Sequence, residues 1–270
     1  MSHERAVSGD HVAFVTGAGR GIGAATVQRL AADGWAVAAL DRCTDDPALP
    51  YPLATRDELD AVVANCPDPS RTLALVADVR DEAALADAVA LAVERFGGLD
   101  AAVAVAGAIA GGTPLWETPA EHVAAMLDVN LGGAIALARA VIPTLLQRPT
   151  PRHGRFVAIA SAAATRGMPG LAAYSAAKAG VTGLTRGLAA DLRGTGVTAN
   201  AVSPGSTATP LLDESARLYD LPSADAFAAQ QTLERLLTPK EVANVIAWLC
   251  GREASALTGA TIAADGGLSL

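Results

Sequence analysis

Short apolar runs alternate with longer stretches that carry alanine, valine and leucine at helical spacing along this chain. The first run, at 11–16, has the length of a strand, and a glycine-rich turn and a helix follow it. Further runs of strand length end at Asp41, just before Asp78, near Gly107 and at Ser161. This order, without a polar linker or an internal repeat, predicts one doubly wound α/β domain of Rossmann type with a central parallel sheet.

The length of 270 residues suits one domain with a sizeable core. We predict that this domain spans 11–270 and that the hydrophilic segment 1–10 is a flexible N-terminus. No uninterrupted apolar run reaches the roughly 18 residues of a membrane span, and the first residues lack the apolar core of a signal peptide. We therefore expect a cytoplasmic protein without a membrane partner.

The net charge and the cysteine and histidine residues argue against nucleic-acid-binding, disulfide-bonded and metal-binding proteins. A net charge of −8 and a pI near 5.0 disfavour a nucleic-acid partner. The three cysteines, Cys43, Cys66 and Cys250, have no C-x-x-C spacing and are expected to be reduced thiols. The four histidines form no ligand cluster, so we predict no metal site.

One of only two lysines stands four residues after a tyrosine, as Tyr174 and Lys178. Residues four apart share one face of a helix, and the surrounding sequence is typical of a helix. A cation about 4 Å from a phenol favours the phenolate by about 4 kcal/mol at an effective dielectric of about 20. This pair is therefore predicted to place a tyrosine with a lowered pKa, able to act as a base, in an active site.

The turn after the first strand carries Gly17, Gly21 and Gly23. A strand, a glycine-rich turn and a helix let backbone N–H groups approach a pyrophosphate. The next strand ends in Asp41, roughly 20 residues further on, where an acid can accept hydrogen bonds from the adenosine ribose. Its carboxylate repels a 2′-phosphate, which favours NAD, whereas Arg20 and Arg42 favour NADP; we predict NAD.

These motifs resemble the short-chain dehydrogenase/reductase family from about Val12 to the C-terminus. The resemblance implies an adenine-contacting acid at Asp78 and a loop after the sixth strand whose threonine holds the nicotinamide carboxamide. The residues assigned to cofactor binding are Gly17, Arg20, Gly21, Ile22, Gly23, Asp41, Arg42, Asp78, Val79, Gly107, Tyr174, Lys178, Pro204, Gly205, Thr207 and Thr209.

The resemblance also implies four catalytic residues. Tyr174 removes the proton of a substrate alcohol while Ser161 holds the substrate oxygen. Lys178 lowers the pKa of Tyr174 and binds the nicotinamide ribose, and Asn130 organises a water that relays the proton. The family usually has Asn-Asn-Ala-Gly after the fourth strand, whereas this chain has Val105 there, which puts local hydrogen bonding of the sheet in doubt.

The crossover after Asp41 is about ten residues longer than usual. Prolines at 47, 50 and 52 exclude a helix from the insertion, residues 42–55, and a helix is predicted from Arg56. The Tyr51–Thr55 segment resembles the mycofactocin-associated, carveol dehydrogenase-like branch of the family. This resemblance implies that the insertion folds over the adenosine end of NAD, that NAD is held without exchange, and that a separate redox carrier accepts the electrons.

The segment 206–236 is expected to form the substrate lid. An apolar wall, which suits a hydrophobic secondary alcohol or ketone, is predicted from Met168, Leu171, Leu211, Leu212 and Tyr219. The alanine- and glycine-rich helices near 117–147 and 171–194 resemble those that join family members into homotetramers.

Three functions remain open at this point. The favoured one is oxidation of a small-molecule alcohol with NAD. A ketone or 3-oxoacyl-thioester reductase using NADPH has the same fold and catalytic residues, but Asp41 disfavours it. A non-catalytic NAD-sensing scaffold is disfavoured by the intact set of catalytic residues.

Overall fold

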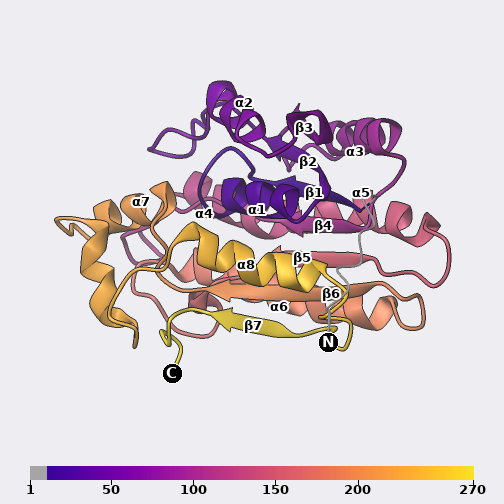
Figure 1. Cartoon of the computed structure of the whole chain (residues 1–270). Helices are drawn as coiled ribbons and strands as arrows, with labels where there is room; N and C mark the ends of the chain where they lie inside the picture. The colour runs from indigo at the N-terminus through magenta and orange to yellow at the C-terminus, as the bar shows by residue number, and fades with distance from the viewer. Residues whose placement is uncertain (1–10) are drawn as a thin grey trace.

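The computed structural model describes residues 11–270, so the predicted flexible segment 1–10 lies outside the described residues. Within this range seven strands form one sheet in the order β3-β2-β1-β4-β5-β6-β7, and all neighbouring strands are parallel (Figure 1). The strands are β1 (Val12–Thr16), β2 (Ala36–Asp41), β3 (Thr72–Val76), β4 (Ala101–Ala104), β5 (Arg155–Ile159), β6 (Thr198–Pro204) and β7 (Thr261–Ala264). The prediction of a single doubly wound parallel α/β domain is confirmed.

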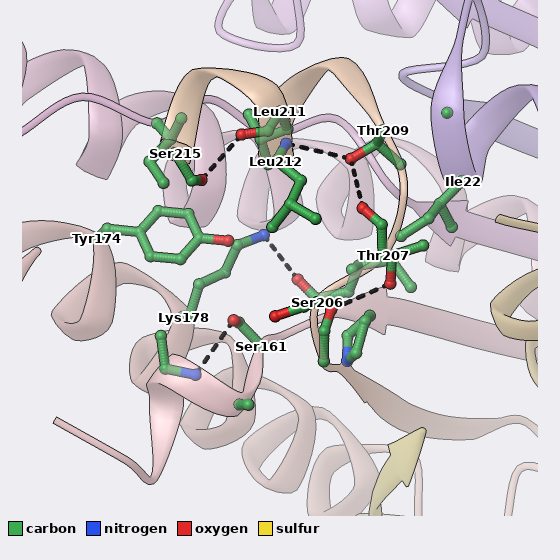
Figure 2. Close-up of a pocket in the computed structure, with 18 of the residues that line it drawn as sticks. Ile22, Ser161, Tyr174, Lys178, Ser206, Thr207, Thr209, Leu211, Leu212 and Ser215 are labelled. Carbon is green, nitrogen blue, oxygen red and sulfur yellow. Dashed lines mark hydrogen bonds between the residues drawn. The ribbon is translucent and has the colours of Figure 1, made fainter. Parts of the chain in front are cut away.

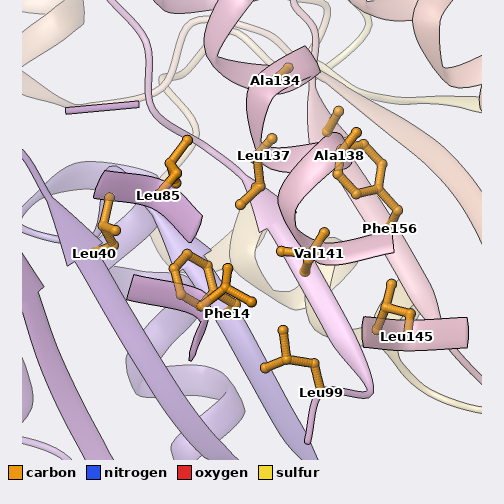
Figure 3. Close-up of a cluster of buried hydrophobic side chains, with 14 of the residues drawn as sticks. Phe14, Leu40, Leu85, Leu99, Ala134, Leu137, Ala138, Val141, Leu145 and Phe156 are labelled. Atoms are coloured by element: carbon orange, nitrogen blue, oxygen red, sulfur yellow. The ribbon is translucent and has the colours of Figure 1, made fainter. Parts of the chain in front are cut away.

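Helices cover both faces of this sheet. The helices are α1 (Gly21–Ala32), α2 (Arg56–Ala64), α3 (Glu82–Phe96), α4 (Ala120–Leu127), α5 (Gly133–Gln147), α6 (Ala172–Asp191), α7 (Pro210–Leu218) and α8 (Pro239–Cys250). One buried cluster joins the sheet to α3, α5 and α6, and Figure 3 shows its Phe14, Leu137 and Phe156 side chains. A second cluster joins the other face to α1, α2 and α8.

The alternation of side chains along β1 explains these two layers. Phe14 belongs to the first cluster, whereas Ala13 and Val15 belong to the second, as expected for a strand buried on both faces. The strand order reverses between β1 and β4. The carboxyl ends of these two strands therefore open the crevice where a doubly wound sheet binds its ligands.

The predicted helix from Arg56 is confirmed, because α2 starts there and Thr55 caps it in a capping box with Glu58. The strand predicted to end at Ser161 ends two residues earlier, at Ile159. Its end has a local cause: the Ser161 hydroxyl accepts a hydrogen bond from the Ala163 N–H, 3.1 Å away, and starts a short 3₁₀ turn.

Replacement of the usual asparagine by Val105 does not break the sheet. The Thr16 hydroxyl accepts hydrogen bonds from the Val105 and Ala106 N–H groups at 3.2 and 3.3 Å. β1 and β4 remain paired as far as Val103. A threonine on the neighbouring strand therefore provides this connection.

Within residues 11–270 one helical stretch, Ala120–Gln147, is long and apolar enough to cross a membrane by length and composition. Its Leu137, Val141 and Leu145 are buried against the sheet. A core helix requires the same composition, so this feature is weak evidence for a membrane span.

Candidate active site

Two cavities occupy the crevice at the carboxyl ends of the strands. The larger cavity, of about 220 Å³, contains all predicted substrate residues and three of the four catalytic ones, and the smaller cavity, of about 120 Å³, contains Asp41 and Asp78. The cofactor residues on the larger cavity are Gly17, Arg20, Gly21, Ile22, Gly23, Gly107, Tyr174, Lys178, Pro204, Gly205, Thr207 and Thr209. Those on the smaller cavity are Gly17, Asp41, Arg42, Asp78, Val79 and Gly107.

The predicted catalytic side chains meet in the larger cavity. Tyr174 and Lys178 extend from α6 toward the same space, beside Ser161 at the end of β5 (Figure 2). The Lys178 Nζ lies 5.8 Å from the centre of the Tyr174 ring and donates a hydrogen bond to the Ile159 carbonyl at 2.9 Å. The Ser161 oxygen accepts a hydrogen bond from the Ala163 N–H, and its hydroxyl also hydrogen-bonds the Tyr174 side chain, so both side chains face the space where a substrate oxygen would bind.

The predicted lowering of the Tyr174 pKa is wrong for the chain as the structure describes it. Burial raises the pKa of Tyr174, and the hydrogen bond with Ser161 lowers it by less. Burial also lowers the pKa of Lys178 from 10.5 to about 8. Burial thus destabilises the charged form of the lysine. Its ammonium donates to the Ile159 carbonyl, and no hydrogen bond joins it to the phenol oxygen.

Asn130 lies outside both cavities, in a π-helical turn, Asp128–Gly132, that joins α4 to α5. Its amide nitrogen donates to the carbonyls of Ala108 and Met126, both at 2.8 Å, and its oxygen accepts from the Ala108 N–H at 3.3 Å. Both donor hydrogens are therefore used. Only the second lone pair of the amide oxygen and the main chain are left for the predicted water.

Gly107 brings Asn130 and Lys178 close to the backbone after β4. A Cβ atom at this position would lie 2.9 Å from the Asn130 Oδ1 and 3.5 Å from the Lys178 Nζ. Any side chain here would push the asparagine away. The absence of a side chain at Gly107 therefore lets Asn130 lie near Lys178, although Asn130 lines neither cavity.

The glycine-rich turn is held against the end of β2. The Gly19 N–H donates to the Asp41 Oδ2 at 2.8 Å, and the Arg42 N–H donates to the Asp41 Oδ1 at 2.7 Å. A Cβ atom at Gly19 would lie 2.7 Å from the Ala54 Cβ. The sequence analysis gave Gly19 no role, although its position between Gly17 and Gly21 could have indicated one.

A network of four charges joins the insertion to the loop after β3. The Asp46 carboxylate, nearly fully buried, pairs with Arg42 at 2.6 Å and with Arg80 at 2.8 Å, and both arginines also contact Asp78. Burial alone would raise the pKa of Asp46 and Asp78, but their hydrogen bonds and the two guanidinium groups bring both pKa values below the ordinary range. Asp46 and Arg80 are further residues that the sequence reading missed.

The insertion contacts both walls of the crevice. The Arg20 guanidinium donates to the Pro52 carbonyl at 2.8 Å, and the Ile109 N–H donates to the Tyr51 hydroxyl at 3.0 Å. Leu49, Leu53 and Ala54 line the smaller cavity from the same segment. The insertion therefore spans the crevice and covers the side that contains Asp41 and Asp78.

Apolar side chains from the lid and from two loops form the rest of the larger cavity. The predicted Met168, Leu211 and Tyr219 all line it, and the Tyr219 hydroxyl donates to the Pro169 carbonyl at 2.6 Å. The predicted Leu171 and Leu212 line it too, whereas the sequence analysis missed four further lining residues: Ile109, Phe227, Gln230 and Leu268. They come from three separate segments and share no motif, so only the fold identifies them.

The loop after β6 is ordered by its threonines. The Thr207 and Thr209 hydroxyls donate to the Gly205 and Thr207 carbonyls at 3.0 and 3.2 Å. Thr209 also caps α7, and its methyl group would lie 3.2 Å from a Cβ atom at Gly21. Helix α7, in the segment predicted to be the substrate lid, therefore begins directly beside the glycine-rich turn.

This arrangement fits a dinucleotide. Glycines leave the turn after β1 open to a pyrophosphate, a carboxylate lies at one end of the crevice, and a lysine and a tyrosine lie at the other. Within residues 11–270 no group of three or more histidine, cysteine and acidic side chains is placed to hold a metal ion.

Comparison with known proteins agrees with this geometry. Residues 17–269 match the family model described as enoyl-(acyl carrier protein) reductase. The chain is 40% identical to the short-chain reductase protein NovJ of Streptomyces niveus over 98% of the chain and 96% of that protein. It is 38% identical to the uncharacterised oxidoreductase MT2820 of Mycobacterium tuberculosis, over 95% of both.

Solved structures of oxidoreductases are also similar to this chain. The crystal structure of carveol dehydrogenase from Mycobacterium avium in complex with NAD superimposes with a TM-score of 0.90 at 32% identity, covering 96% of this chain and 97% of that one. This similarity includes the carveol dehydrogenase branch that the insertion predicted. The chain therefore belongs to the short-chain dehydrogenase/reductase family.

Proposed function

We propose that this protein is an NAD-dependent oxidoreductase that interconverts a hydrophobic secondary alcohol and its ketone. The observation that carries this proposal is that Ser161, Tyr174 and Lys178 line one cavity together with the apolar side chains Met168 and Leu211. A cavity with a few convergent polar groups on an apolar wall suits a substrate with one reacting oxygen and a hydrocarbon body.

The chemistry follows from the hydrogen-bond directions in the site. When substrate is bound, the Ser161 hydroxyl turns from Tyr174 to donate to the substrate oxygen and stabilises negative charge there. Tyr174 takes the hydroxyl proton during oxidation and returns it during reduction. Lys178, released from the Ile159 carbonyl or shared with it, stabilises the phenolate. NAD, when bound, supplies the hydride acceptor and a positive charge next to Tyr174.

The contacts of two arginines support NAD over NADP. Arg20 donates to the Pro52 carbonyl, and Arg42 is paired with Asp46 and Asp78. Both guanidinium groups thus bind the insertion or the residues next to it, and neither is left to bind a 2′-phosphate. Asp41 faces the smaller cavity with its carboxylate fixed by two N–H groups, which disfavours a 2′-phosphate.

We infer that the insertion slows the exchange of NAD. Its contacts with Arg20, Ile109 and Arg80 have to break before the adenosine end can leave the smaller cavity. This supports placement in the mycofactocin-associated branch, in which a separate redox carrier reoxidises the cofactor. Rapid incorporation of labelled NAD into the purified protein would exclude slow exchange and leave the alcohol chemistry untouched.

A second candidate is a biosynthetic reductase that uses NADPH on a ketone or a 3-oxoacyl thioester. The similarity to NovJ and to a family model described as a reductase favours it. The same catalytic residues serve both directions, so the coenzyme decides between them. A clear preference for NADPH in binding and turnover would select this candidate.

We further propose a cytoplasmic homotetramer. Leu127 and Ile135 on the long helical stretch are more than one-third exposed in the single chain, and a second copy would cover them. The mass of the protein in solution tests this assembly.

The first experiment is to denature protein purified without added cofactor and to identify the released nucleotide by mass spectrometry. Nearly one NAD per chain would support both the coenzyme and the role of the insertion. An empty protein would favour an exchangeable coenzyme, and titration with NAD and NADP would then test Asp41. Bound NAD without turnover, even with artificial electron acceptors, would favour a non-catalytic NAD-sensing scaffold.

A further inference from the structure

A third cavity lies at the amino ends of β5 and β6, the opposite end of the strands from the catalytic residues. It is open, has a volume of about 690 Å³, and lies among the loop before β5, the end of α6 with its following loop, and the segment after α8. Arg155 starts β5 on this side, whereas Ser161 follows its other end. At about 3.3 Å per residue the two sites are about 20 Å apart.

Basic side chains gather around this cavity. Arg152, His153, Arg155 and Arg193 line it, and Arg252 is close enough to affect the pKa of His153 and Arg155. In the described part of the chain none of these five forms an ion pair. Eight arginines elsewhere do: Arg29, Arg42, Arg56, Arg80, Arg139, Arg148, Arg217 and Arg235.

Arg155 is a buried cation that forms no ion pair with any residue of 11–270, although Glu253 is near enough to affect its pKa. Only 2% of its surface is exposed, and its Nε and Nη1 donate to the Gly251 and Gly154 carbonyls at 3.2 and 3.0 Å. The third nitrogen, Nη2, makes no hydrogen bond with any residue in 11–270. Gly251 follows the C-terminus of α8, so the helix dipole offsets only part of this charge.

The electrostatics of the cluster show an excess of positive charge. Burial lowers the pKa of Arg155; Arg252 acts in the same direction, Cys250 and Glu253 act against it, and the net shift is downward. Burial also lowers the pKa of His153, and Arg252 and Arg155 act in the same direction. Because the whole chain carries a net charge of −8, this cationic face is a local feature and not a consequence of composition.

Two hydroxyl-bearing residues, Ser255 and Thr258, complete the cavity wall. The Thr258 oxygen accepts a hydrogen bond from the Ala199 N–H at 3.3 Å, which leaves its hydrogen free to donate. Guanidinium groups match the oxygen spacing of phosphate, and hydroxyl donors add to such a site. The donor set is therefore that of an oxyanion site.

We propose that this cavity binds a phosphate-class oxyanion, either free phosphate or the phosphate group of a small metabolite. The site is separate from the catalytic cavity and independent of the proposed oxidation chemistry. Its wall includes Arg152, the buried Arg155 and the exposed Arg193, and the exposed Arg252 adds positive charge nearby.

Calorimetric titration of the NAD-saturated protein at low salt tests this proposal, because saturation with NAD occupies the glycine-rich turn. Inorganic phosphate and ribose 5-phosphate are the two probes, and tighter binding of one identifies the ligand's source. Arg193→Gln and Arg252→Gln should each weaken binding about fivefold, at the upper end for an exposed charge pair. Arg139→Gln, which removes an exposed, ion-paired arginine, should leave it unchanged.

Three results would overturn the proposal. The first is the absence of binding heat with either probe. The second is equal affinity in wild type and the Arg193→Gln variant, which would place the anion elsewhere. The third is a loss of assembly mass in Arg193→Gln without any phosphate binding, because this face would then join copies of the chain.

Discussion

The Lys178 ammonium donates a hydrogen bond to the Ile159 carbonyl, 2.9 Å away, while it lies 5.8 Å from the centre of the Tyr174 ring. The lysine is thus anchored to the end of β5, next to the strand residues that lead into Ser161. This contact places the ammonium between the strand and α6. It also means that the stability of the site depends on the protonation of a buried lysine.

Replacing Lys178 with methionine should reveal this dependence. Burial lowers the pKa of Lys178 to about 8, below the 10.5 of the ordinary group, so the folded chain binds fewer protons between these values. The cost of burying the charge is fully present below pH 8 and decreases as the pH rises toward 10.5. The unfolding free energy of wild type relative to Lys178→Met should therefore increase by about 2 kcal/mol between pH 7 and 9.5.

Chemical denaturation of both cofactor-free proteins at a series of pH values measures this difference. Groups that titrate in both proteins cancel in the comparison. A difference that does not change with pH would show that Lys178 keeps its ordinary pKa in the folded chain.

Tyr174→Phe should reduce turnover by at least about 100-fold, because a general acid or base is lost. Binding of NAD should persist, since the change removes one oxygen from a buried side chain. Tyr219→Phe is the matched control: it removes a hydroxyl that donates to the Pro169 carbonyl on the cavity wall, and it should mainly raise KM. Equal kcat values for Tyr174→Phe and wild type would contradict the catalytic assignment.

Asp41→Asn should shift the coenzyme preference toward NADP by about tenfold, because the amide no longer repels a 2′-phosphate. An asparagine has one side-chain oxygen, so only one of the Gly19 and Arg42 N–H groups would keep its hydrogen-bond acceptor. Titration with NAD and NADP measures the ratio of the two dissociation constants. Asp33→Asn, at the exposed end of α1, should leave this ratio unchanged.

Asp46→Asn should accelerate the release of NAD by about tenfold or more, because Arg42 and Arg80 lose the buried carboxylate between them. Release can be followed by exchange with labelled NAD. Asp60→Asn, which breaks an exposed pair with Arg56 on α2, serves as the control. An unchanged rate in Asp46→Asn would show that the charge network does not limit release.

The sequence predicts the fold and the meeting of Tyr174 and Lys178 in one cavity, for physical reasons. The glycines of the turn, Gly17–Gly23, are only a few residues apart in the sequence. The same is true of Tyr174 and Lys178. Local spacing then determines which side chains share a face. The same holds for α2, whose start at Arg56 follows from a proline-rich segment and a capping threonine.

Other features depend on contacts between distant segments. The pairing of Asp46 with Arg80, the contact of Tyr51 with the Ile109 N–H, and the gathering of arginines near β5 have no local pattern. The error on the Tyr174 pKa has the same origin. Helical spacing predicts that the two side chains are close, but it gives neither the burial of the phenol nor the competing Ile159 carbonyl.

The most direct test of the central claim is to add a panel of hydrophobic secondary alcohols to the NAD-containing protein and record the absorbance of reduced nicotinamide. We expect at least one alcohol to give about one reduced nicotinamide per bound NAD in wild type and none in Tyr174→Phe. An oxidised cofactor across the whole panel, with no turnover when artificial electron acceptors are supplied, would contradict this expectation.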